Sequence, residues 1–305
     1  MPTDNETEEH WRCWQSFSLE AYTRFQTALE RHRDRHPGLT SYDIVQKVNE
    51  TKGTFAWFWG ASSEVQESIN LLNAWGIRIH EWSAWNDVVS NYQEEERKWE
   101  ILNHFLEPIA FYCMLQPSSF ADRLALTAEN LIHQANQFVS PEEPDRLVQD
   151  DRPGKPLRRS DRRKQLGKLG ERWKKFSDFQ RNLHLLDGDE YSGLTSNFRD
   201  LAAHSFSPRL LLGQISRSIR SIVPFPEMAR QDDGTYLEVE HPTKTAVSYA
   251  MICQEPLSLE ETHDANLAEY QRAKLAMEAL IALTYELCNA IDQKIKNSKV
   301  IPDFN

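Results

Sequence analysis

The sequence has no long apolar run and few cysteines, glycines or prolines. No stretch approaches the ~20 apolar residues of a membrane span, and the first ten residues, MPTDNETEEH, are polar and acidic. We therefore expect neither a membrane span nor a signal peptide, and a cytoplasmic location. Four cysteines without a CxxC pair favour reduced thiols in the core over a zinc site or a disulfide framework. With 11 glycines and 14 prolines, the chain is not a low-complexity sequence.

Several motifs of enzyme chemistry are also missing from the sequence. It contains no GxxxxGK[ST] or GxGxxG phosphate loop, no GxSxG nucleophile elbow and no HExxH zinc motif. The pairs Glu100/His104 and Glu129/His133 are four residues apart, whereas carboxylate-bridged di-iron bundles use Glu-x-x-His. We therefore expect no metal ion and no cofactor.

Positive charge is concentrated in one segment of an otherwise acidic chain. The net charge is −11, yet residues 152–175 hold eleven lysines and arginines against two acidic residues. By charge alone, such a segment fits either of two interpretations. One is local contact with a polyanion such as RNA, and the other is a solvated helix whose cations pair with acidic neighbours. The candidate RNA contacts in this segment are Arg158, Arg159, Arg162, Arg163 and Lys164.

Apolar residues recur at helical spacing through most of the chain, which predicts an all-α antiparallel helical bundle. We expect a helical, tryptophan-rich segment at residues 1–90, whose tryptophans are core residues rather than a base-stacking platform. A bundle domain is expected at 91–305, with one helix ending at Pro117.

Two regions of this bundle domain are expected to interrupt the long helices. Residues 139–156, rich in proline and charge, predict a flexible loop. A further helix is expected over 208–222. Alternating residues near 235–254 predict a small β-hairpin around His241-Pro242, before a last helix at 257–296.

One cluster of polar residues has the composition of a catalytic site. Residues 197–209 read NFRDLAAHSFSPR, with four residues between Arg199 and His204, and Asp200 directly after the arginine. Arg31/His36 and Arg97/His104 have similar spacings, but only the pair at 199 and 204 lies where one helical segment gives way to another. This pattern resembles the R-x4–6-H motif of the HEPN superfamily, many of whose members are metal-independent ribonucleases of toxin–antitoxin and phage-defence systems. The helical order around the motif agrees over roughly residues 91–297.

The resemblance implies an endoribonuclease that uses the 2′-hydroxyl of RNA as nucleophile, without metal. Arg199 and His204 would be catalytic, because histidine exchanges protons near neutral pH and arginine binds phosphate oxygens. Asp200 would orient the arginine. Additional RNA contacts would come from Asn197, Ser205 and Arg209. The resemblance also implies a homodimer with facing motifs, and an antitoxin or regulatory partner. Two alternatives remain: a non-catalytic HEPN domain that binds RNA or regulates, and a helical interaction or scaffold protein.

Overall fold

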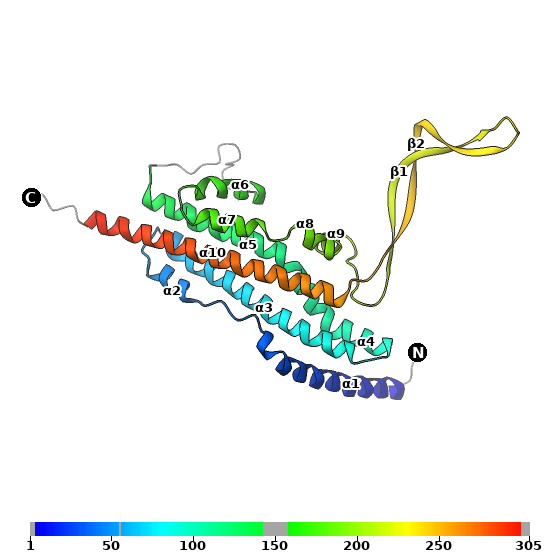
Figure 1. Cartoon of the computed structure of the whole chain (residues 1–305), viewed down its shortest axis with the longest axis horizontal. Helices are drawn as coiled ribbons and strands as arrows, with labels where there is room; N and C mark the ends of the chain where they lie inside the picture. The colour runs from blue at the N-terminus through cyan, green and yellow to red at the C-terminus, as the bar shows by residue number, and fades with distance from the viewer. Residues whose placement is uncertain (1–3, 55, 143–157, 300–305) are drawn as a thin grey trace, which may run out of the picture. The chain divides into compact units, whose positions relative to one another are not determined.

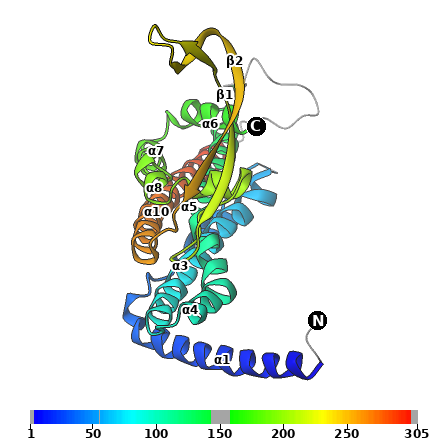
Figure 2. The same cartoon turned by 90° about the vertical axis from the view of Figure 1, so that its right-hand side faces the viewer.

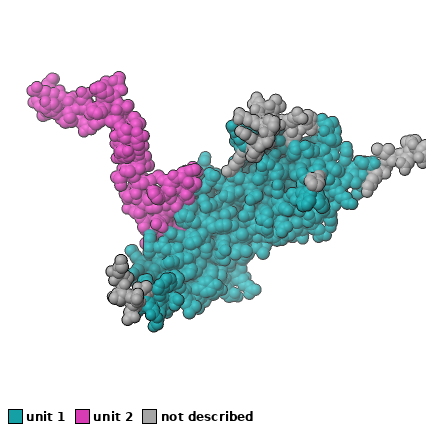
Figure 3. Space-filling view, turned by 180° about the vertical axis from the view of Figure 1, so that it is seen from behind, with its two compact units in different colours: residues 1–199, 259–305 teal, residues 200–258 magenta. Residues whose placement is uncertain are grey.

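The structure is a computed structural model that describes residues 4–54, 56–142 and 158–299 (Figure 1). The chain divides into two compact units, coloured separately in Figure 3. Residues 1–199 with 259–305 form a helical unit, and residues 200–258 form a unit built around a β-hairpin. The protein is therefore mostly helical, with one antiparallel pair of strands.

Three long helices form the centre of the helical unit: α3 (Ser62–Ser90), α5 (Glu107–Val139) and α10 (Leu259–Lys299). They pack against one another, and shorter helices cover them (Figures 1 and 2). The covering helices are α1 (Asp4–Arg31), α2 (Asp43–Glu50), α4 (Glu95–Ile101), α6 (Arg159–Gly170), α7 (Phe176–His184) and α8 (Asp189–Leu194). None of the described helices combines the length and apolar character needed to cross a membrane.

Tryptophans supply much of the core of this unit. Trp57, Trp75, Trp82 and Trp85 are buried, which confirms the expectation for these four. Trp85 stacks between Phe25 of α1 and Phe105 at centroid distances of 4.5 and 4.6 Å. The expectation is wrong for two others, because the Trp11 and Trp59 side chains are exposed. These lie on an outer helix face and in the π-helical turn Trp57–Ala61, where no second layer covers them among the described residues.

A buried polar network joins the three central helices. Asn266 of α10 accepts a hydrogen bond from Trp75 Nε1 of α3 at 2.9 Å. Its amide donates at 2.9 Å both to the Cys113 carbonyl oxygen of α5 and to the Tyr191 hydroxyl of α8. Burial raises the pKa of Tyr191, so its hydroxyl stays protonated and can donate to the Met114 carbonyl. Because each polar group here has a partner, the network fixes the register of the helices.

Close helix contact also requires a glycine. A Cβ on Gly76 of α3 would lie 2.5 Å from the Tyr270 hydroxyl oxygen of α10. Only a residue without a side chain leaves room for the Tyr270 ring there. Burial raises the pKa of Tyr270 to about 12.

Several boundaries predicted from the sequence are wrong. Pro117 does not end a helix: it lies buried inside α5, which continues to Val139. Pro117 cannot donate to the Cys113 carbonyl oxygen, which accepts instead from the Asn266 amide of α10 at 2.9 Å. Of the loop expected at 139–156, residues 143–156 lie outside the described residues. The compact units also differ from a division at residue 90, because α3 packs on α5 and α10 in one core.

The second unit contains strands β1 (Ile215–Arg230) and β2 (Tyr236–Gln254), paired antiparallel. The helix expected at 208–222 is therefore wrong, because residues 215–222 belong to β1 and pair with β2. The isoleucines of ISRSIRSIV are four and three residues apart, which is a helical spacing, and the pairing with β2 overrides it. The hairpin expected at 235–254 is also placed wrongly, since His241-Pro242 lies within β2. The chain turns instead at Gly234, whose φ of +85° suits glycine.

Two cysteines depart from the expected core position. Cys113 and Cys288 are buried, and burial raises the pKa of both thiols. Cys13 and Cys253 are exposed, so the expectation of core thiols is wrong for these two. All four are free thiols.

Candidate functional site

The Arg199/His204 motif lies on a short helix, α9 (Phe198–His204). Phe198 is its anchor: the ring is buried and packs edge-on against Phe111 of α5, with centroids 4.7 Å apart. Arg199, Asp200 and His204 are all exposed. One aromatic side chain therefore fixes the start of the helix and leaves its polar residues accessible.

The backbone around α9 is strained. Among the described residues, the non-glycine residues with positive φ are Asp187, Ser196, Asn197 and Leu211, with φ between 50° and 59°. This conformation costs roughly 1–2 kcal/mol for residues such as Ser196 and Leu211, and less for aspartate and asparagine. All four lie in the 25-residue segment 187–211 around the motif, and two directly precede α9. Strain of this kind persists where surrounding structure enforces it, and it is concentrated at functional sites.

The contacts that hold this strain come from the bundle. The Asp187 backbone N–H donates to Glu269 Oε2 at 2.9 Å, and Glu269 is completely buried in α10. Arg272 pairs with Glu269 at 2.5 Å and with Glu190 at 3.2 Å. The Asn197 N–H donates to the Ser192 carbonyl oxygen at 2.7 Å. The segment before α9 is therefore tied to the most buried part of the helical unit.

Helix geometry separates the two motif residues. Five positions along an α-helix correspond to a rotation of about 140°, so Arg199 and His204 project to different sides of α9. Asp200, in contrast, lies four positions before His204, about 40° away, on the same side. The carboxylate predicted to orient the arginine therefore shares a helix side with the histidine.

A second arginine lies beside the end of α9. Arg217 Nη1 of β1 donates to Ser205 Oγ at 2.9 Å, one residue beyond His204. Arg217 Nε is buried and has no hydrogen-bond partner among the described residues. Arg217 was not among the predicted site residues. The isoleucines of ISRSIRSIV are four and three residues apart, so the local pattern does not predict the strand that places Arg217 beside Ser205.

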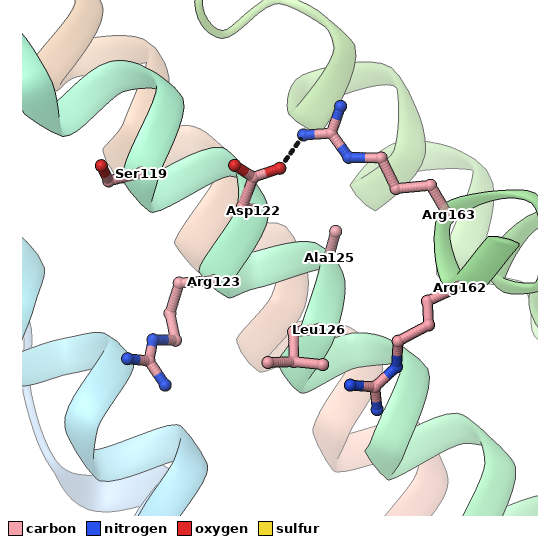
Figure 4. Close-up of a pocket in the computed structure, with 7 residues that line it drawn as sticks. All are labelled: Ser119, Asp122, Arg123, Ala125, Leu126, Arg162 and Arg163. Atoms are coloured by element: carbon pink, nitrogen blue, oxygen red, sulfur yellow. Dashed lines mark hydrogen bonds and ion pairs between the residues drawn. The ribbon is translucent and has the colours of Figure 1, made fainter. Parts of the chain in front are cut away.

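Two arginines of the basic segment, Arg162 and Arg163, are engaged with α5. Arg162 pairs with Glu129 at 2.7 Å and donates to Asn130 Oδ1 at 2.7 Å. Burial raises the pKa of Glu129, and the nearby Arg162 opposes that shift. Arg163 pairs with Asp122 (Figure 4). Arg158 and Lys164 are exposed, and nothing is described of the Arg159 side chain. The alternative of ion pairing with acidic neighbours therefore applies to Arg162 and Arg163.

These contacts border a groove of about 410 Å³ between α5 and α6. Figure 4 shows Arg163 reaching toward Asp122, while Arg123 extends the other way, toward the blue ribbon. Ala125 and Leu126 lie between the arginines. The groove is thus cationic at its rim, with one carboxylate already paired to Arg163.

The two other predicted positions lie beside α9. Asn197 is exposed directly before the helix, whereas Arg209 is half-buried and its carbonyl oxygen accepts from the Leu257 N–H at 2.8 Å.

Within residues 4–54, 56–142 and 158–299, no three His, Cys, Asp or Glu side chains are arranged to hold a metal ion.

Comparison with protein-family models, with curated proteins and with solved structures finds no match for this chain. The residues and their geometry therefore carry the functional argument.

Proposed function

We propose that the protein binds RNA at the exposed residues of α9 and cleaves it without a metal ion. The observation that carries this proposal is the concentration of strained backbone around an exposed arginine, aspartate and histidine. The resemblance of this segment to the HEPN motif supports RNA as the substrate and a toxin or antiviral defence role. The helical bundle that anchors α9 is compatible with such a fold.

The reaction needs few protein groups, because RNA carries its own nucleophile. His204 takes the proton from the 2′-hydroxyl, whose oxygen attacks the adjacent phosphorus. The bond from phosphorus to the 5′-oxygen breaks, and that oxygen takes a proton from water. The products are a 2′,3′-cyclic phosphate and a 5′-hydroxyl. Asp200, on the same helix side, orients the imidazole and stabilises its protonated form.

Two arginines have different roles in this proposal. Arg217, next to Ser205, binds the phosphate that reacts, since its guanidinium lies beside the end of α9. Arg199 projects about 140° away from His204 and binds a neighbouring phosphate of the same RNA strand. In a dimer with facing motifs, Arg199 would instead act in the partner's site.

The decisive experiment is RNA cleavage in EDTA by purified protein. We expect His204→Ala to lower the cleavage rate about 100-fold or more, as loss of general acid–base catalysis does. His184→Ala is the matched control, because His184 is also exposed and also ends a short helix. Equal rates for the wild type and His204→Ala would refute the proposal.

Substitutions of Arg217 and Arg199 should change different kinetic constants, kcat and KM respectively. Arg217→Ala should lower kcat, because it removes a contact to the reacting phosphate. Arg199→Ala should mainly raise KM. Arg230→Ala is the control, an exposed arginine at the other end of β1. A large loss of kcat in Arg199→Ala would instead favour the composite, dimeric site.

The exposed cations of α6 offer a further test of RNA binding. Replacing Arg158 and Lys164 by serine should reduce the slope of log affinity against log salt by about 0.7 for each single-strand phosphate contact. Unchanged salt dependence would mean that this helix only pairs with α5.

A further inference from the structure

The β-hairpin exposes large apolar side chains along its whole length. It consists of a base ladder, where Ile215–Pro224 pairs with Thr245–Gln254, and a tip ladder, where Pro226–Arg230 pairs with Tyr236–Glu240. The register shifts between the two ladders, and the ribbon bends there (Figures 1 and 2). Among the described residues the sheet contains only these two strands. An isolated two-stranded ribbon is marginally stable in water.

One face of the base ladder is apolar with a single cation. Cross-strand partners share a face, and alternate pairs lie on the same side. Tyr249, Met251 and Ile222 on this face have exposed fractions of 63, 69 and 60%. Arg220, the partner of Tyr249, lies among them. The base ladder contains no acidic residue.

One face of the tip ladder has a net negative charge. Met228 and Tyr236 are exposed on it, and the same set of alternate pairs contains Glu238, Glu240 and one cation, Arg230. The turn adds Asp232 and Asp233, so the tip is acidic whereas the base is basic.

We propose that this surface pairs with a second copy of the chain, with the tip ladder of each hairpin on the base ladder of the other. A two-fold axis forms two equivalent contacts. The tip of the first hairpin packs on the base of the second, and the tip of the second packs on the base of the first. Arg220 then meets Glu238 and Glu240 of the partner. The exposed apolar side chains of both ladders become buried.

The charge pattern favours a second copy of the chain over another partner, because the acidic tip of the hairpin is complementary to its basic base ladder. This interface differs from a dimer with facing α9 motifs and does not depend on ribonuclease activity.

Sedimentation of the full chain at micromolar concentration gives the first test. We expect a dimer that Met251→Glu weakens about tenfold or more, because the added carboxylate would face Glu238 and Glu240 of the partner. The control is Leu275→Glu, at a side chain that is 52% exposed on α10. A wild-type monomer, or a dimer that Met251→Glu leaves intact, would overturn the proposal.

Charge exchange gives the sharper test. Arg220→Glu alone, and Glu238→Arg with Glu240→Arg, should each weaken the dimer about tenfold or more through like-charge contacts. An equimolar mixture of these two variants should restore wild-type association, because both contacts of the mixed dimer then join opposite charges. Circular dichroism melts check that each variant is folded. A mixture as weak as its components would refute the pairing of tip and base.

Discussion

The helical unit buries most of its large apolar side chains, whereas the hairpin leaves many of its own exposed. The helical unit buries Trp57, Trp75 and Trp82 completely or nearly so, and hydrogen-bonds the polar groups of Asn266 between its helices. The hairpin leaves Tyr249 and Met251 more than 60% exposed. The helical unit thus holds its stabilising contacts internally, whereas the hairpin needs a surface from outside itself to bury its apolar residues.

Truncating one large side chain in each region should produce the largest contrast. Trp75→Ala should lower the free energy of unfolding by about 3–5 kcal/mol, because it opens a cavity between α3, α5 and α10. Leu237→Ala in the tip ladder, where the side chain is 57% exposed, should change it by less than about 0.5 kcal/mol. Urea unfolding measures both. Similar losses in the two variants would mean that the hairpin is packed as tightly as the bundle.

The polar network should show the next largest effect. Asn266→Ala leaves Trp75 Nε1 and the Cys113 carbonyl oxygen buried without a partner, which should cost about 1–3 kcal/mol. Asn182→Ala is the control, because Asn182 makes only an exposed hydrogen bond to the Asp178 carbonyl. Thermal unfolding of both variants tests this, and equal melting temperatures would show that the network is dispensable.

A smaller effect should appear as a pH dependence of the helical unit. Burial lowers the pKa of His133, and burial together with His36 and His32 lowers the pKa of His80. The unfolded chain then binds more protons than the folded chain, so stability falls as pH drops below about 6.5. His133→Gln with His80→Gln should flatten the melting temperature between about pH 7 and pH 5. An unchanged slope would assign acid sensitivity to other groups.

Sequence reasoning succeeded where one periodicity extended over many residues. The last helix, expected at 257–296, is α10 at Leu259–Lys299, because apolar residues recur along its entire length. It failed at 208–222, where leucines and isoleucines at helical spacing suggested a helix, but residues from Ile215 onward pair with β2 and form a strand. It also failed at Pro117, where tertiary packing overrides the local preference of proline.

The sequence predicted only part of the candidate site. The spacing of Arg199 and His204 picked out α9, and the polar, small residues around it agree with its exposure. Arg217 could not be found in this way, because it reaches Ser205 only through the fold of the hairpin. The ion pairs of Arg162 and Arg163 with α5 likewise join residues more than thirty positions apart.

The sequence by itself determined the helical character of most of the chain, the tryptophan-rich core and the exposed motif on α9. These follow from local periodicity and side-chain chemistry. Only the tertiary structure decided which polar residues meet, because hydrogen bonds such as that between Trp75 and Asn266 depend on the packing of distant helices. It also decided that both faces of the hairpin stay exposed, since strand pairing is set by contacts between segments that are far apart in the chain.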